Sequence, residues 1–183
     1  MFGDLSLSIN IRLEKPCDIQ RIHRITIAAF LDEPYADHTE QFIVKALRDA
    51  GALTISLVAE DSAQTVGHVA VSPVSISDGS IDWYGLGPIS VIPNEQGKGI
   101  GQQLINFGIQ ELKTLGVKLV FTYGDPSFYS KVGFEKIGEE VVKAPKKLTY
   151  PEGWLAQSLN NERITSEVGV AKCISALNKQ EYW

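Results

Sequence analysis

The chain is poor in the residues that hold metals or form disulfide frameworks. Its 183 residues include two cysteines, Cys17 and Cys173, and three histidines, His23, His38 and His68. The histidines are isolated from one another and from both cysteines, so they lack the spacing of a metal site. The two thiols lie far apart in the sequence, and we expect them to be reduced, as in a cytoplasmic protein. No metal ion is therefore expected.

Long apolar runs and tracts of basic residues are also missing. No run approaches the roughly 20 apolar residues that cross a bilayer, and the first residues lack the basic and apolar regions of a signal peptide. The 17 basic residues are scattered among 22 acidic ones, which gives a formal net charge of -5. We therefore expect a cytoplasmic protein with no membrane partner, and nucleic acid is disfavoured as the main partner. The acidic balance suits a cationic amine substrate, although it is common in soluble proteins of every kind.

The composition does provide material for a core. Hydrophobic residues make up 44% of the chain and charged residues 21%, which fits one globular domain over residues 1–183. We expect the core of this domain at about 8–140, whereas 141–183, where the pattern of helix and strand signals is looser, form a C-terminal extension. The sequence leaves the assembly open, with a homodimer among the alternatives.

Helix and strand patterns alternate along the chain. Hairpin-like turn signals separate the first strands, so these are expected to be antiparallel, whereas the strand after the long central helix is expected to be parallel to the strand before it. A crevice should open at the carboxyl ends of this parallel pair. Strands are predicted at 7–13, 53–59, 66–71, 84–92, 117–123 and 169–177, and helices from about 18, from about 37, at 99–115 and at 154–159.

A glycine-dense turn lies between the strand at 84–92 and the central helix. Glycines at 97, 99 and 101 allow a tight turn with outward N–H groups, and the following helix adds the positive end of its dipole. This pattern predicts a site for a diphosphate, although a glycine cluster can also be a simple strand-to-helix connection. The spacing excludes a P-loop, which needs a glycine at 92 and Ser or Thr at 99, and it disfavours a dinucleotide fingerprint, which needs a glycine at 102.

The spacing that is present, Gln96-x-x-Gly99-x-Gly101, resembles the acetyl-coenzyme A signature of the GNAT superfamily of N-acetyltransferases. A second element, Phe128-Tyr129-x-x-x-Gly133-Phe134, is similar to a motif of the same superfamily and follows in the right order. The resemblance narrows to the bacterial YhbS-like subgroup through the segments 56–59, 66–68, 72–74, 85–88 and 124–126.

This resemblance implies a fold. It is a layered α/β arrangement, with a mixed and mostly antiparallel twisted sheet of about six or seven strands. Helices cover both faces, and the parallel strand pair is splayed at the cofactor site. It also implies acetyl-CoA as co-substrate, with the pantetheine arm between the splayed strands.

The resemblance assigns cofactor contacts to the strand and to the turn. Backbone groups of Ile89, Ser90 and Val91 would pair with the pantetheine amides. The turn would hold the pyrophosphate, and Lys98 would either add charge near the 3'-phosphate or remain in solvent. The residues that the resemblance assigns to the turn are Gln96, Gly97, Lys98, Gly99, Ile100 and Gly101.

Tyr129 is the candidate for catalysis. When an amine attacks the thioester, the departing thiolate needs a proton, and a phenol with a pKa near ~10 carries one at neutral pH. By resemblance, the tyrosine at this place in the motif reaches the coenzyme A sulfur. The alternative is a core aromatic residue on a short amphipathic helix.

The base that deprotonates the amine is not identified by the sequence. Glu33, Asp82, Asp125 and His68 are candidates, although Asp125 also reads as the cap of the tyrosine helix. Three residues are predicted near the acceptor pocket: Glu33, His68 and Trp83.

The function that these features predict is transfer of an acetyl group from acetyl-CoA to a primary amine by direct attack on the thioester. The acceptor is a small molecule, a peptide or a protein. The alternative is a non-catalytic module that binds or senses acyl-CoA, and the presence of Tyr129 favours the enzyme. An acetyltransferase acting on aminoacyl-tRNA would need a basic face, which the charge balance disfavours.

Overall fold

The computed structural model describes residues 9–32, 39–75, 83–164 and 169–183. Short 3-10 turns occur at η1 (Pro16–Asp18), η2 (Pro93–Glu95), η3 (Ser130–Val132), η4 (Pro151–Gly153), η5 (Ser175–Leu177) and η6 (Gln180–Tyr182). The helices are α1 (Ile19–Phe30), α2 (Glu40–Asp49), α3 (Ile100–Thr114) and α4 (Pro126–Tyr129). The strands are β1 (Asn10–Leu13), β2 (Ile55–Asp61), β3 (Gln64–Ser75), β4 (Trp83–Val91), β5 (Leu119–Tyr123), β6 (Glu135–Lys136), β7 (Trp154–Ser158) and β8 (Lys172–Cys173).

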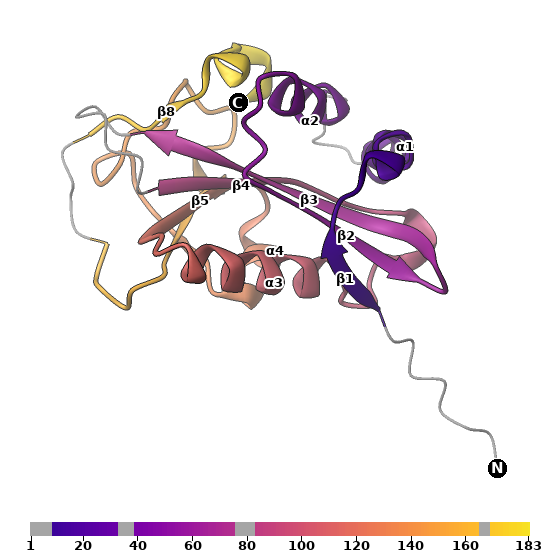
Figure 1. Cartoon of the computed structure of the whole chain (residues 1–183). Helices are drawn as coiled ribbons and strands as arrows, with labels where there is room; N and C mark the ends of the chain where they lie inside the picture. Colours follow the sequence, from indigo (N-terminus) through magenta and orange to yellow (C-terminus); the bar gives the residue numbers. More distant parts are fainter. Residues whose placement is uncertain (1–8, 33–38, 76–82, 165–168) are drawn as a thin grey trace.

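One mixed sheet organises the described residues. Its order is β1-β2-β3-β4-β5-β7-β6, and β8 pairs with the end of β3. Only the β4–β5 pair is parallel among the described strand pairs, as the crossover through α3 requires. Helices α1 and α2 lie on one face and α3 and α4 on the other (Figure 1). This arrangement confirms the expected fold class, with two strands of two residues each included in the sheet of eight.

Helix α3 packs closely against the sheet because two of its residues have no side chain. A β-carbon at Gly108 would lie 3.6 Å from Leu57 Cδ1, and one at Gly101 would lie 3.5 Å from Ile89 Cδ1. Leu104 of the same helix is completely buried. Burial of a side chain of this size contributes about 1.5–3 kcal/mol, so the apolar face of α3 holds the helix, and the turn before it, in place.

Strand β5 separates two hydrophobic clusters. Val120 belongs to the cluster under α3, whereas Leu119 and Phe121 belong to the cluster on the opposite face. Successive side chains of a strand point to opposite faces, and in β5 both faces are covered. This two-sided burial makes β5 a rigid border for the space between β4 and β5.

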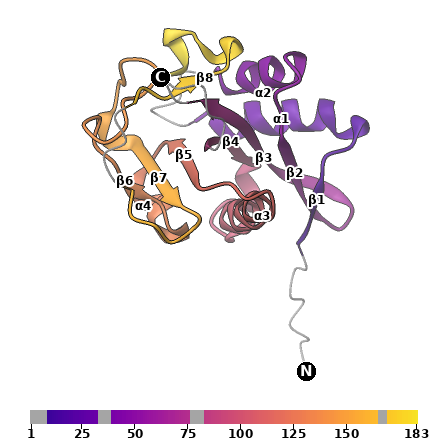
Figure 2. The ribbon, with the colours of Figure 1, turned by 60° about the vertical axis from the view of Figure 1, so that its left-hand side comes forward.

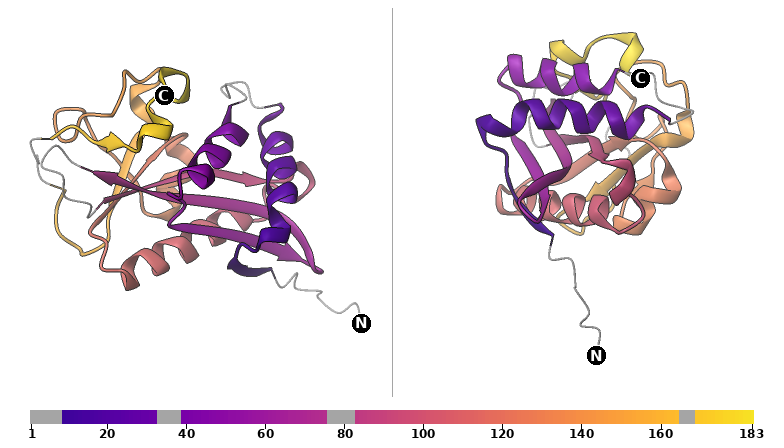
Figure 3. Two further views of the ribbon diagram at one scale, coloured as in Figure 1. Left: turned by 45° about the horizontal axis from the view of Figure 1, so that its top comes forward. Right: turned by 90° about the vertical axis from the view of Figure 1, so that its right-hand side faces the viewer.

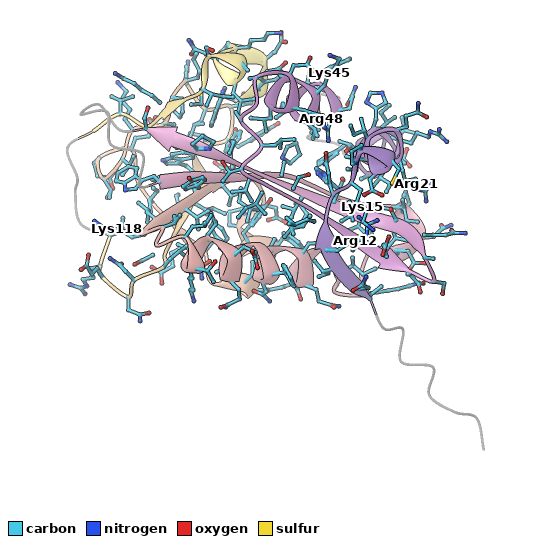
Figure 4. The ribbon with its side chains drawn as sticks, in the orientation of Figure 1. Arg12, Lys15, Arg21, Lys45, Arg48 and Lys118 are labelled. Carbon is cyan, nitrogen blue, oxygen red and sulfur yellow. The ribbon has the colours of Figure 1, made fainter. Side chains whose placement is uncertain are left out.

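Two arginines fasten the elements around α1 and α2 to the sheet (Figure 4). Arg12 of β1 donates to Asp18 over 2.7 Å, and this contact holds the pKa of the Asp18 carboxyl below its usual range. Arg48 of α2 donates to Glu14 over 2.8 Å. The second pair fixes α2, whose first turn carries Glu40.

Two expectations for the last third of the chain are corrected. Residues 154–159 were expected as a helix, but 154–158 form β7, between β5 and β6 (Figure 2). Its consecutive apolar residues fill clusters on both faces, Leu155 on one side and Trp154 on the other, and such a run reads equally well as a short helix. The strand expected at 169–177 is reduced to β8, followed by η5.

Some expectations fall outside the described residues. These are Asp37 at the start of the second helix, the turn at 77–79, and the candidate bases Glu33 and Asp82. In the parts of the chain that are described, no helix is both long and apolar enough to span a membrane. The described side chains also contain no group of three or more His, Cys, Asp or Glu residues able to hold a metal ion.

Candidate active site

The parallel strands β4 and β5 separate partway along their length. Their backbone pairing ends at Gly85 and Phe121. Beyond this point β4 is irregular, because two residues, Gly87 and Pro88, lie opposite one residue of β3. A single side-chain bond spans the start of the opening, where Thr122 Oγ1 donates to the Leu86 carbonyl over 2.9 Å. The two strands therefore form the sides of a gap in the sheet.

Successive residues of β4 direct their backbone N–H and C=O groups alternately toward β3 and toward this gap. The Ile92 N–H donates to Val66 of β3 over 2.9 Å, so two residues earlier Ser90 also directs its backbone groups toward β3. Ile89 and Val91 direct theirs to the other edge, toward the gap. Consistent with this direction, the Val91 carbonyl accepts a bond of 3.0 Å from the side chain of Gln96.

The glycine turn lies at the end of β4. Gly97 and Gly99 have φ of 76° and 80°, which is the left-handed region that glycine adopts without strain. A β-carbon at either position would meet no atom within 4 Å, so the turn faces open space. Helix α3 begins directly afterwards, without a side-chain cap. Its first N–H groups and dipole thus form a site suited to a phosphate group.

Lys98 does not face the cavity beside this turn. Its ammonium group lies 2.9 Å from a carboxylate oxygen of Glu95, and the side chain is partly exposed. This distance between the two charged groups is that of an ordinary ion pair. Of the two alternatives for Lys98, the structure favours a side chain at the solvent, paired with Glu95.

Tyr129 lies at the end of α4, just after β5. The helix begins at Asp125, whose carboxylate accepts the Ser127 N–H over 2.8 Å, so Asp125 acts as its cap. The Tyr129 ring is 6% exposed and packs edge-on against Phe134, with 5.6 Å between the ring centroids. It also lies against Gly124, where a β-carbon would be 2.7 Å from the ring.

The phenol of Tyr129 is held in its protonated form. Burial raises its pKa above the ordinary value, and a hydrogen bond with Thr122 opposes this shift only in part. A phenol that is neutral at physiological pH can donate a proton to an anionic leaving group beside it.

A cavity of about 1260 Å³ connects these features. Thr122 and Tyr123 are consecutive in β5, so their side chains point to opposite faces of the sheet, yet both line the cavity. The cavity therefore passes through the gap between β4 and β5. At one end lie the glycine turn and Tyr129, and at the other lie Tyr123 and Trp183.

This geometry suits a long ligand. A diphosphate fits the N–H groups of the glycine turn, an extended amide-bearing arm fits the edge of β4, and the reacting atom would reach the phenol of Tyr129. A family model described as an acetyltransferase (GNAT) domain matches residues 10–137, which include the turn, the gap and Tyr129. The chain belongs to the GNAT family of acetyltransferases.

Curated GNAT relatives extend over most of the chain. The uncharacterized N-acetyltransferase YhbS of Escherichia coli strain K12 is 37% identical over 126 residues, covering 68% of this chain and 72% of the relative. The uncharacterized N-acetyltransferase YjhQ of the same organism is 30% identical over 155 residues, covering 81% and 83%. The resemblance to YhbS-like N-acetyltransferases is thereby confirmed.

Solved structures of GNAT proteins share the fold. A GNAT family acetyltransferase from Brucella melitensis in complex with acetyl-CoA is 36% identical, with a TM-score of 0.76 over 93% of this chain and 99% of that one. The Escherichia coli YhbS structure in complex with CoA is 29% identical, with a TM-score of 0.82 over 98% and 97%. These likenesses show that the chain shares the fold of both structures.

Most residues that the sequence assigned to the GNAT cofactor site lie together. Ser90 and Lys98 are the exceptions among the described residues. The side chain of Ser90 lies under α1, 3.3 Å from that of Thr26, and the side chain of Lys98 pairs with Glu95. Those that line the cavity are Ile89, Val91, Gln96, Gly97, Gly99, Ile100, Gly101 and Tyr129.

Of the residues predicted near the acceptor, the two that the structure describes do not line the cavity. His68 is completely buried on the α1 and α2 face, where its ring nitrogen lies 2.8 Å from Ser56 Oγ, and it does not line the described cavity. Trp83 packs in the core with its ring centroid 5.1 Å from that of Phe121. Glu33 lies outside the described residues.

Other lining residues were missed by sequence reasoning. Thr122 could have been found, because it alternates with the apolar residues of β5 and points to the face of Tyr129. Glu40, Glu152 and Trp183 come from distant parts of the chain, and no local pattern connects them.

Proposed function

We propose that this GNAT protein binds acetyl-CoA and transfers its acetyl group to a primary amine by direct attack on the thioester. The observation that carries the proposal is the cavity that passes between β4 and β5 and joins the glycine turn, the edge of β4 and Tyr129. Family membership and two relatives whose structures contain acetyl-CoA or CoA support the choice of co-substrate.

The binding roles follow from the geometry. The N–H groups from Gly97 to Gly101 would receive the pyrophosphate, aided by the positive end of the α3 dipole. Ile89 would pair with the amides of the pantetheine arm, as an added strand would. This arrangement would place the sulfur and the acetyl group in the gap, near Tyr129.

The chemical step is a substitution at the thioester carbonyl. The lone pair of the neutral amine forms a bond to the carbonyl carbon, the C–S bond breaks, and the thiolate of CoA takes the proton of the Tyr129 phenol. The attacking nitrogen loses its extra proton to water, and the phenolate then regains a proton. The protonated, buried state of Tyr129 supports its role as the acid.

The experiment that tests the proposal is calorimetric titration of the purified protein with acetyl-CoA, with CoA, ATP and NAD as comparison ligands. Selective binding of acetyl-CoA and CoA supports the proposed site. Thiol release in the presence of primary amines then supports transfer. Binding without thiol release for any amine tested would favour a non-catalytic acyl-CoA binding module, and binding of ATP or NAD instead would overturn the assignment.

A further inference from the structure

The cavity has a second end on the face of α1 and α2, and aromatic rings form its walls. The ring of Phe121 stacks on that of Trp154 with centroids 5.1 Å apart. The ring of Trp183 stacks on that of Tyr123 at 6.3 Å and meets Trp154 edge-on at the same separation. All four residues line the cavity, so aromatic rings border this end.

The segment 170–183 holds Trp183 in this wall. Cys173 of β8 pairs with Val74 of β3, which brings the segment onto the α1 and α2 face. The indole N–H of Trp183 donates to the Leu177 carbonyl over 3.1 Å, and its own carbonyl accepts from Thr149 over 3.0 Å. Figures 1 and 3 show this segment beside α2, against which η5 packs.

The charged side chains that line this end are carboxylates, whereas Lys179 lies over the ring of Tyr182 at 5.4 Å and the charge of Lys146 acts on Cys173. Glu40, Glu152 and Glu181 line it, and Glu181 has Lys179 as a neighbour at 3.7 Å. Among the described lining residues the only cation is Lys131, which follows the tyrosine helix at the opposite end.

Glu152 is an exposed residue that lines the same cavity as the aromatic wall. Burial raises the pKa of the Tyr123 phenol, and the negative charge of Glu152 adds to this shift. A carboxylate beside the faces of aromatic rings is a favourable place for an ammonium group, because both the charge and the ring quadrupole attract it.

The volume leaves room for a second molecule. A pocket for one drug-sized ligand occupies roughly 300–1,000 Å³, and the cavity of about 1260 Å³ exceeds this range. The pantetheine arm would fill the gap between the strands and leave space for a second molecule in the rest of the cavity.

We infer that the acceptor is a diamine or a longer polyamine. One amino group would lie at the gap and attack the thioester, while a second, charged ammonium group would lie between Glu152 and the rings of Tyr123 and Trp183. This inference rests on the proposed function, since it names the acceptor of the same site. It excludes acceptors that carry a carboxylate or phosphate where the second ammonium group would lie.

The test compares acceptors of matched length. The rate of thiol release from acetyl-CoA is measured with diaminobutane, butylamine and aminobutanoate, and with a series of diamines from propane to hexane and spermidine. We expect kcat/KM for the best diamine to exceed that for the matched monoamine by at least about tenfold, the effect of one well-placed charge contact. The amino acid should be the poorest acceptor.

Two substitutions localise the effect. Glu152→Gln should raise KM for the diamine about two- to fivefold and leave butylamine nearly unchanged, whereas Glu135→Gln, at an exposed position on β6, should change neither. Trp183→Leu should raise KM in the same way, and Trp183→Phe, which keeps a ring but also loses the indole bond to Leu177, should retain most of the affinity.

The outcomes separate the inference from the proposed function. If acetyl-CoA does not bind, the proposed function fails and this inference fails with it. If acetyl-CoA binds but butylamine or aminobutanoate is used as well as the diamines, or if Glu152→Gln leaves the preference for diamines intact, the proposed function stands and the polyamine acceptor is overturned. No use of any diamine by a protein that acetylates other amines would also overturn it.

Discussion

Tyr129 is the residue on which the proposed chemistry depends most directly. Tyr129 lines the cavity, and its ring packs on Phe134 and Gly124, so removal of the oxygen alone should leave the packing intact. Tyr129→Phe should lower kcat by about 10² or more while the affinity for acetyl-CoA stays nearly constant, because general acids typically contribute this much. Steady-state kinetics and calorimetry measure the two quantities.

A matched control shows whether a loss of turnover is specific to Tyr129 or follows the removal of any phenol from the sheet. Tyr84 lies on β4 of the same sheet but does not line the described cavity, so Tyr84→Phe should leave kcat unchanged. A Tyr129→Phe enzyme with wild-type turnover would remove Tyr129 from the mechanism.

We expect His68 to affect stability rather than catalysis, because its ring is buried away from the cavity. Burial and the nearby charge of Arg48 lower its pKa from 6.5 to about 3, and the charge of Asp18 opposes this shift. Ser56 Oγ contacts one ring nitrogen at 2.8 Å, and a Glu14 oxygen lies 3.8 Å from the same atom. The ring therefore remains neutral over most of the acidic range.

This shift predicts a pH dependence of folding stability. Below pH 6.5 the unfolded chain binds a proton at His68 and the folded chain does not, so stability is complete above pH 6.5 and falls as the pH falls toward 3. The loss should be about 2 kcal/mol between pH 6.5 and 5. Urea denaturation at several pH values measures it. His68→Gln should flatten this slope, and His23→Gln, at an exposed position on α1, should not; equal slopes for His68→Gln and wild type would contradict the assignment.

At the scale of elements, the glycine turn and α3 offer a paired test of the cofactor site. Gly99 precedes α3 and Gly116 follows it, with φ of 80° and 74°, and a β-carbon at either would meet no atom within 4 Å. Alanine at each should cost about 1 kcal/mol of stability through backbone strain. Only Gly99→Ala should also lower acetyl-CoA affinity, by about tenfold or more, because only its methyl group would occupy the space of the pyrophosphate.

Thermal denaturation and calorimetry of the two variants measure these effects. Equal affinities for acetyl-CoA in Gly99→Ala and Gly116→Ala would contradict a phosphate site at the turn. A large loss of stability in Gly99→Ala alone would show that the turn is needed for folding.

Elements that depend on neighbouring residues could be predicted from the sequence. The turn, α3 and the tyrosine helix each have a local signal in glycine spacing, apolar periodicity or a capping residue. The parallel pairing of β4 and β5 followed from the helix between them. The gap was therefore predictable before its geometry was known.

Elements that depend on distant partners were harder to predict. Nothing local in 154–158 indicates insertion beside β5, and burial of both faces removed the alternation that marks a strand. For the same reason the sequence did not predict to which face of the sheet His68 points, because both faces of β3 are buried around it. The wall formed by Trp183 depends on β8 joining the far end of β3, which no residue near Trp183 indicates.

On the scale of the whole molecule, the two ends of the cavity lie on opposite faces of the sheet. Acetyl-CoA would approach from the face of α3, and the acceptor from the face of α1 and α2, so each could bind while the other is present. Such an arrangement predicts a sequential mechanism, in which both substrates are bound before any product leaves. Initial rates measured at several concentrations of both substrates should give intersecting double-reciprocal lines.

The alternative mechanism passes the acetyl group through an enzyme nucleophile, and Cys173 is the candidate because it lines the cavity. Burial raises the pKa of its thiol, which decreases the fraction of reactive thiolate at neutral pH. We therefore expect Cys173→Ser to retain kcat/KM within about twofold, as should Cys17→Ser at an exposed position. Parallel lines together with an inactive Cys173→Ser enzyme would instead show that the acetyl group is transferred twice, and direct attack across the gap would be wrong.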